Sequence, residues 1–243
     1  MKFFNMDSPL MQALNKVADL MWLNILTLIC CIPVITVGPA MTALHYTALK
    51  MARDEECYIA RDFFKSFKLN LRQGIVIWLI ELVIITLLVG DFLILQNAEI
   101  AFGEPMRVIL MVVAVLILFL FTFAYPVLAK FDNTVMRTLK NALFIGILQF
   151  PKTILMMIVS VIPAVLFVLA PQILPLVFLF GFSAPAWVSA KLYNKFFKKL
   201  EEEMKGDEDS GQGKAQKGEE DERIFKDELD ESLNEDPPRI GKA

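Results

Sequence analysis

Five long apolar stretches constrain the fold of this chain more than any other feature of its sequence. They run over about residues 20–39, 75–95, 108–129, 153–170 and 173–190, and the third carries no charged side chain. Each is close to the roughly 17–25 residues that a helix needs to cross the hydrocarbon core of a bilayer. Because lipid offers the backbone no hydrogen-bond partners, segments of this kind must be helical. The sequence therefore predicts an all-α integral membrane protein, a bundle of about five transmembrane helices.

Charge divides the chain into two parts. Residues 1–200 hold 17 Lys and Arg against 11 Asp and Glu, a net charge of +6, whereas residues 201–243 hold 7 against 16, a net charge of −9. A segment with so much charge and so few apolar residues cannot bury enough surface to offset the entropy of ordering. We therefore predict a transmembrane helical domain over 1–200 and an acidic, largely disordered cytoplasmic tail over 201–243.

The basic residues also predict the orientation in the membrane. The loop 40–74 holds six Lys and Arg, the loop 130–152 holds four and the stretch 191–199 holds four, whereas 96–107 holds one and 171–172 holds none. Loops rich in Lys and Arg remain in the cytoplasm. With five spans, this pattern predicts a multi-pass protein of the cell membrane with a cytoplasmic C-terminus and an extracellular N-terminus.

Three residues at the end of the first apolar stretch, Pro33, Gly38 and Pro39, are candidates for a helix break. Pro39 suits the first turn of a new helix, because proline lacks the N–H that would be unbonded there. A short helix, a break and a re-entrant second half would return the chain to the side it came from and leave the N-terminus cytoplasmic. Residues 18–50 thus form either one span or a broken pair, and the sequence leaves both open.

Two basic amphipathic helices are expected on the cytoplasmic side. Over residues 60–73, the apolar residues Ala60, Phe64, Phe67 and Leu71 follow one stripe, and basic residues occupy the rest of the surface. A weaker pattern of the same kind covers 130–143. Such helices lie in the membrane interface, dock on a partner, or fold against the bundle as ordinary positive-inside loops. The candidate cytoplasmic interaction surface comprises Arg61, Phe63, Phe64, Lys65, Phe67, Lys68, Arg72, Arg137 and Lys140.

No enzyme motif is present in the sequence. The run GQGK at 211–214 lacks the earlier glycine of a phosphate-binding loop, and the single histidine, His45, excludes a histidine-cluster metal site. We therefore expect no catalytic residue, no metal and no cofactor, and we expect that the protein is not an enzyme.

Glu81 and Asn24 are the candidate intramembrane polar residues. An ionisable side chain in hydrocarbon is costly and faces a bundle interior or a cavity. Glu81 therefore either contacts a proton, an ion or a solute, or serves as a hydrogen-bonded structural carboxyl paired with Asn24.

Several sequence pieces together are similar to those of a known family. They are the opening Phe-Phe-Asn, Asp19 with Asn24, the Pro33…Gly38-Pro39 break and the run Arg-Asp-Phe-Phe-Lys-Ser-Phe at 61–67. In these pieces the chain resembles, over residues 1 to about 195, the YesL-like family (domain of unknown function 624) of Gram-positive bacteria.

The resemblance implies a multi-span membrane protein encoded beside carbohydrate ABC importers, with no catalytic residues to carry over. It leads us to expect a non-enzymatic accessory or regulatory partner of a carbohydrate ABC importer. The expected partners are the lipid bilayer and either permease subunits or a second copy of the chain, with no nucleic acid. The alternative is an autonomous small transporter or channel that uses Glu81.

Overall fold

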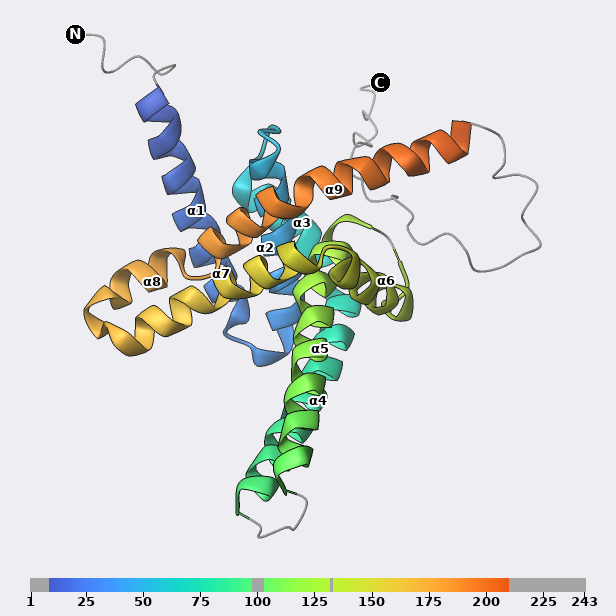
Figure 1. Cartoon of the computed structure of the whole chain (residues 1–243). Coiled ribbons are helices and arrows are strands. Elements are labelled where there is room, and N and C mark those ends of the chain that lie inside the picture. The colour runs from blue at the N-terminus through green and yellow to red at the C-terminus, as the bar shows by residue number, and fades with distance from the viewer. Residues whose placement is uncertain (1–8, 98–102, 132, 210–243) are drawn as a thin grey trace, which may run out of the picture.

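The computed structural model describes residues 9–97, 103–131 and 133–209, and within these residues the regular structure is entirely helical (Figure 1). The prediction of an all-α membrane fold is confirmed. In chain order the elements are α1 (Pro9–Cys31), the 3-10 turn η1 (Val34–Thr36), α2 (Val37–Ala52), α3 (Ile59–Leu69), α4 (Leu71–Asn97), α5 (Gly103–Lys130), α6 (Val135–Leu148), α7 (Phe150–Leu169), the 3-10 turn η2 (Pro171–Ile173), α8 (Leu174–Phe180) and α9 (Ser183–Asp209).

The first apolar stretch is broken rather than continuous. Helix α1 ends at Cys31, and Pro33 precedes the turn η1 before α2 begins. The hydroxyl of Thr36 donates a hydrogen bond to the carbonyl of Cys30 at 2.7 Å, which satisfies one of the acceptors left open at the end of α1. The expectation of one span over 20–39 is therefore wrong, and the alternative of a broken pair is the arrangement observed.

Helix α2 runs back alongside α1. The ammonium group of Lys16, in the N-terminal part of α1, lies 2.7 Å from a carboxylate oxygen of Asp54, just beyond the end of α2. Figure 1 shows the two helices as an antiparallel pair joined at their lower ends. The chain therefore returns, after α2, to the side from which α1 started.

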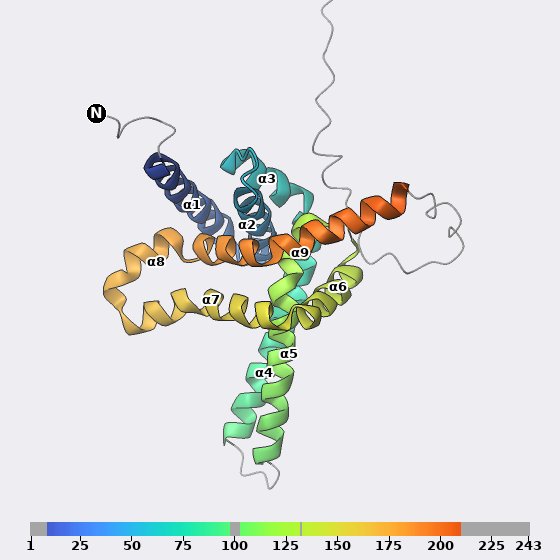
Figure 2. The same cartoon turned by 45° about the horizontal axis from the view of Figure 1, so that its top comes forward.

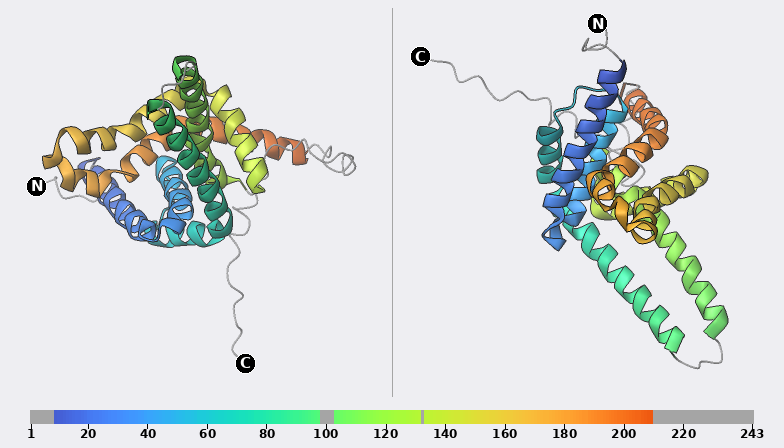
Figure 3. Two further views of the ribbon diagram at one scale, coloured as in Figure 1. Left: turned by 90° about the horizontal axis from the view of Figure 1, so that it is seen from below. Right: turned by 90° about the vertical axis from the view of Figure 1, so that its left-hand side faces the viewer.

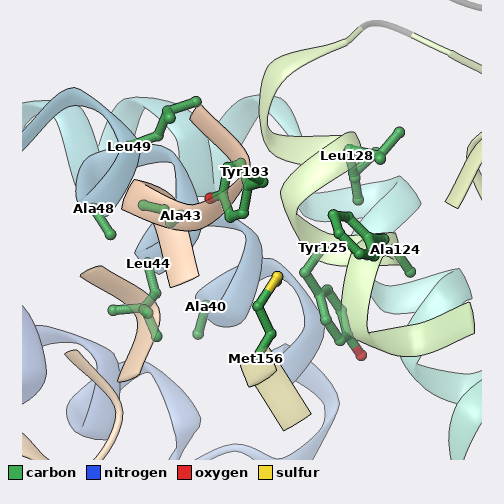
Figure 4. Packing of buried hydrophobic residues seen from close by; sticks show 14 of the residues in the cluster. Ala40, Ala43, Leu44, Ala48, Leu49, Ala124, Tyr125, Leu128, Met156 and Tyr193 are labelled. Carbon is green, nitrogen blue, oxygen red and sulfur yellow. The ribbon is translucent and has the colours of Figure 1, made fainter. Parts of the chain in front are cut away.

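Helix α2 lies at the centre of the structure. It packs against α1, α3, α4, α5 and α9, and eleven of its sixteen residues are buried. Ala40, Ala43 and Ala48 are fully buried on it, and small residues of this kind let neighbouring helices approach closely. Figure 4 shows Ala43 beside Tyr193 of α9, and Met156 of α7 between α2 and Tyr125 of α5.

The first turns of α2 and α4 touch through glycines. A Cβ atom added at Gly38 would lie 2.1 Å from the carbonyl oxygen of Gly74, and one added at Gly74 would lie 2.8 Å from the backbone nitrogen of Pro39. Gly38 and Pro39 are thus in the first turn of α2, whereas the break itself is at Ile32–Pro33. Gly38 serves the contact between two helices because no larger residue fits there.

Helices α4 and α5 form a hairpin that projects from the remaining helices (Figures 1 and 3). They contain the apolar stretches expected over 75–95 and 108–129. Most of their large apolar side chains are exposed; Val83, Leu87 and Met111, for example, are 55%, 63% and 65% exposed. An apolar surface of this size fits a hairpin that faces lipid.

The third pair is formed by α7 and the bent helices α8 and α9 (Figure 2). Helix α7 contains nearly all of the stretch expected over 153–170. The stretch expected over 173–190 is not one straight helix, because α8 ends at Phe180 and α9 begins at Ser183 after a bend of 47°. The prediction of a simple fifth span is corrected to a bent pair.

Helix α9 continues well past the predicted domain boundary at residue 200. It ends at Asp209, and its residues Tyr193 and Phe197 are fully buried, with ring centroids 4.6 Å apart. Residues 201–209, which were predicted as part of the disordered tail, are therefore helical, and residues 210–243 lie outside the described residues.

Candidate functional site

The short helix α3 is held firmly on α2. The backbone N–H of Tyr58 donates to a carboxylate oxygen of Asp62 at 3.1 Å, which gives a partner to a backbone donor at the start of the helix. The ammonium group of Lys50, on α2, lies 3.6 Å from the other oxygen of Asp62. At the other end, the side-chain amide of Asn70 donates to the carbonyl of Ser66 at 3.0 Å. Of these contacts, the Lys50–Asp62 pair joins the two helices and turns the Asp62 side of α3 toward α2.

The inward face of α3 is centred on Phe63 rather than on Phe64. Phe63 is fully buried, whereas Phe64 is 41% exposed. Phe67 is partly buried and stacks on Phe63 with a centroid separation of 6.3 Å and an interplanar angle of 18°. Phe63 therefore belongs to the core, and its placement in the interaction surface is wrong, because α2 packs against this side of the helix.

The outward side, which we call the α3 face, combines cations with apolar side chains. Its exposed members are Arg61, Phe64, Lys68, Leu69, Leu71 and Arg72. Lys65 is partly exposed beside them. Because α4 begins at Leu71, the α3 face ends where a spanning helix starts. Its position and chemistry suit a contact at the membrane surface.

The two basic residues of the second amphipathic helix, Arg137 and Lys140, are exposed on α6. Helix α6 packs chiefly on α5, whereas α3 packs chiefly on α2. The nine residues predicted as one interaction surface thus divide between two helices with different neighbours.

Glu81 is engaged by a partner on the next helix. The hydroxyl of Tyr125, on α5, donates a hydrogen bond to its carboxylate. Tyr125 is 7% exposed and Glu81 is partly buried, so the pair lies at the α4–α5 contact. The expected pairing of Glu81 with Asn24 is wrong. A buried carboxyl with a hydroxyl donor is a satisfied polar contact and also a group able to exchange a proton.

Asn24 instead holds the bend between α8 and α9. Its side-chain nitrogen donates to the carbonyl of Phe178 at 2.6 Å, and its side-chain oxygen accepts from the backbone N–H groups of Phe182 and Ser183, both at 2.9 Å. A broken helix within the membrane exposes backbone groups that lipid cannot satisfy. Asn24, fully buried on α1, supplies the missing partners. Its role is therefore structural.

A buried ionic cluster joins three helices on the side where α2 ends. The guanidinium group of Arg53 donates to both carboxylate oxygens of Glu201, at 2.5 and 3.2 Å, and to the side-chain oxygen of Asn194 at 2.8 Å. The ammonium group of Lys130, at the end of α5, is 4.0 Å from Glu201. Sequence reasoning missed this cluster, because Glu201 opens a run of three glutamates and nothing in that run distinguishes it.

Two groups in the loop after α2 have perturbed pKa values. The hydrogen bond and charge of Lys16 lower the pKa of Asp54. Burial, together with the nearby Asp62, raises the pKa of the Cys57 thiol to about 12. A thiol that remains protonated at neutral pH is a poor nucleophile. The raised pKa of Cys57 is thus the opposite of the lowered pKa that activates a catalytic cysteine.

These features define a multi-pass helical membrane protein. Among the described residues, four helices are long and apolar enough to cross a membrane, and the bent pair α8–α9 makes up to five. Residues 20–92 match the sequence profile of the family described as "Protein of unknown function, DUF624". The match covers residues 20–92 of the 243-residue chain and supports an assignment to this family.

The matched segment begins within α1 and ends within α4, so it includes the broken pair, the α3 face and Glu81. No curated protein and no solved structure matches the chain. The YesL-like and Gram-positive details of the expected family remain predictions.

Proposed function

We propose that the chain is a non-enzymatic accessory protein of the cell membrane that docks on a membrane partner through the α3 face. The observation that supports this proposal is that Phe64, Leu69 and Leu71 are exposed side by side with three exposed cations. Aromatic and cationic side chains on a rigid element are frequent anchors of protein interfaces. The resemblance noted in the sequence makes permease subunits of a carbohydrate ABC importer the partner to test first.

The contacts of α1 and α2 also support a proposal for the orientation of the chain in the membrane. The Lys16–Asp54 ion pair puts the start of α1 beside the loop that leads to the basic helix α3. Basic residues follow α2 and α5 and line α9, whereas residues 31–37 and 170–174 carry no charge. By the positive-inside rule, both termini are then cytoplasmic. This orientation departs from the extracellular N-terminus expected from five simple spans.

A pull-down of the tagged native protein in mild detergent tests the accessory function. Cells are grown on glucose and on a plant polysaccharide, and mass spectrometry identifies the partners. We expect permease subunits in near-stoichiometric amount with the wild type and loss of most of that signal with Phe64→Ser/Lys68→Gln. The matched control is Lys195→Gln/Lys198→Gln, which removes two exposed cations from α9 and leaves the α3 face intact. Unchanged recovery with the α3 variant would show that the surface is wrong.

A second candidate function rests on Glu81. A carboxyl within α4, bonded to Tyr125 across the hairpin, is the kind of group that carries protons or ions in small transporters. In this case Glu81→Gln should abolish flux in proteoliposomes without lowering the yield of folded protein. The control is Asp91→Asn, which changes an exposed acid on the same helix and should leave the flux unchanged. Purification of the chain without any partner would favour this candidate, and wild-type flux equal to that of empty vesicles would exclude it.

A further inference from the structure

Helix α6 carries an exposed stripe of side chains that is basic at one end and apolar at the other. Arg137, Lys140, Phe144, Ile147 and Leu148 follow one another at helical spacing, and all five are exposed. The three apolar members are 51%, 57% and 54% exposed. The cations therefore occupy the N-terminal end of the stripe and the apolar side chains its C-terminal end.

The opposite face of α6 is firmly packed, so the stripe cannot simply turn inward. Thr138, Asn141, Ala142, Ile145 and Gly146 are buried. At Gly146 an added Cβ would lie 3.3 Å from the carbonyl oxygen of Phe119 on α5, so the two helix backbones lie close together. The orientation of the stripe is thus set by the contact between α5 and α6.

The apolar end of the stripe continues onto a membrane-facing surface. Helix α7, which is long and apolar enough to cross a membrane, begins at Phe150, two residues after α6 ends. Phe150, Ile154 and Ile158 on α7 are 56%, 39% and 54% exposed. The apolar end of the stripe is therefore continuous with the exposed apolar side chains of a candidate spanning helix, and the basic end is the end of α6 farther along the chain from it.

We propose that the α6 stripe is a binding site for an anionic phospholipid of the cytoplasmic leaflet. The two cations bind the headgroup phosphate, and the apolar residues contact the first part of the acyl chains. Arginine and lysine beside a membrane surface are strongly attracted to anionic lipid, and amphipathic helices combine this attraction with apolar insertion. The site lies outside the α3 face, so it stands apart from the proposed docking function.

Native mass spectrometry of the purified full-length protein in mild detergent tests the site. Dioleoyl phosphatidylglycerol, dioleoyl phosphatidylcholine and glycerol phosphate are each titrated against the wild type. We expect retention of phosphatidylglycerol alone. For Arg137→Gln/Lys140→Gln we expect an apparent affinity about 30-fold weaker, from the loss of two cations at an anionic surface. The control variant Lys195→Gln/Lys198→Gln, which removes two exposed cations from α9, should bind like the wild type.

A conservative variant separates loss of charge from loss of fold. Arg137→Lys/Lys140→Arg keeps both cations and should retain phosphatidylglycerol, and Phe144→Ser/Ile147→Ser should remove the preference for dioleoyl over short-chain phosphatidylglycerol. Equal retention of phosphatidylcholine, equal binding of glycerol phosphate, or unchanged affinity in the Gln variant would each overturn the proposal. Loss of a co-purifying protein from the Gln variant, with lipid retention unchanged, would assign the stripe to a protein partner and overturn it as well.

Discussion

Replacement of Asn24 by leucine removes the three hydrogen bonds that hold the bend between α8 and α9. Leucine has the same branching and the same number of side-chain heavy atoms as asparagine, so it keeps the shape of the side chain. The carbonyl of Phe178 and the N–H groups of Phe182 and Ser183 lose their side-chain partner. Hydrogen bonds between helices in a membrane contribute about 0.6 kcal/mol each on average. In soluble proteins the net contribution is roughly 1 kcal/mol. Three such bonds predict a loss of about 2–3 kcal/mol in the free energy of unfolding.

The assay for this change is reversible unfolding in mixed micelles of increasing SDS content, followed by tryptophan fluorescence. Asn15→Leu provides a matched control, because Asn15 lies on the same helix and is exposed. The control should leave the free energy of unfolding within about 0.5 kcal/mol of the wild type, as for most exposed substitutions. If Asn24→Leu behaves like Asn15→Leu, then Asn24 does not hold the bend and the reasoning is refuted.

Three further predictions follow from other contacts. Gly74→Ala should destabilise the protein markedly, because the added Cβ would meet the backbone of α2. The control Gly90→Ala adds a Cβ with no atom within 4 Å and should be neutral or stabilising by up to about 1 kcal/mol. Equal effects of the two substitutions in thermal unfolding would contradict the close contact between α2 and α4. Glu201→Gln removes the closest counter-charge of the buried Arg53 guanidinium, which then keeps only the more distant Glu55, and should cost up to about 3 kcal/mol in SDS unfolding. A wild-type value would show that the cluster contributes nothing. Because Lys16 lowers the pKa of Asp54, this pair stabilises the fold above the ordinary carboxyl pKa of about 4, and the stabilisation is lost as the pH falls through the lowered value. The difference in melting temperature between wild type and Lys16→Gln should therefore be small at pH 7, since the pair is exposed, and should shrink as the pH falls below about 4. A difference that does not change with pH would rule out the ion pair as its cause.

The features that could be predicted from the sequence are those that depend on local composition. Spanning length, the alternation of basic and charge-poor segments and the helical spacing of Phe63, Phe64 and Phe67 are all visible in short windows. The break near Pro33 was visible as well, because proline stops a helix by its own geometry. Whether the chain then continued across the membrane or turned back depended on contacts with later residues.

The features that could not be predicted join residues far apart in the chain. Asn24 lies 158 residues from Phe182, and Arg53 lies 148 residues from Glu201. A single sequence contains no signal for such pairs. The choice between Phe63 and Phe64 as the buried side chain likewise depends on where α2 lies against α3. In this last case, the position of α2 at the centre of the bundle decides the outcome.

Both proposals require that α3 and α6 lie on the cytoplasmic side, together with the start of α1. Impermeant maleimide labelling of single-cysteine variants in intact cells tests this arrangement most directly. The background lacks Cys30, Cys31 and Cys57, and the probe positions are Gln12, Val34, Lys68, Lys140 and Gln172.

We predict labelling of intact cells at Val34→Cys and Gln172→Cys, which lie where the first and third helix pairs turn. Gln12→Cys, Lys68→Cys and Lys140→Cys should react only after permeabilisation. Labelling of Gln12→Cys in intact cells would contradict the broken pair as the basis of the topology. Labelling of Lys68→Cys or Lys140→Cys in intact cells would contradict the docking and lipid-binding proposals respectively.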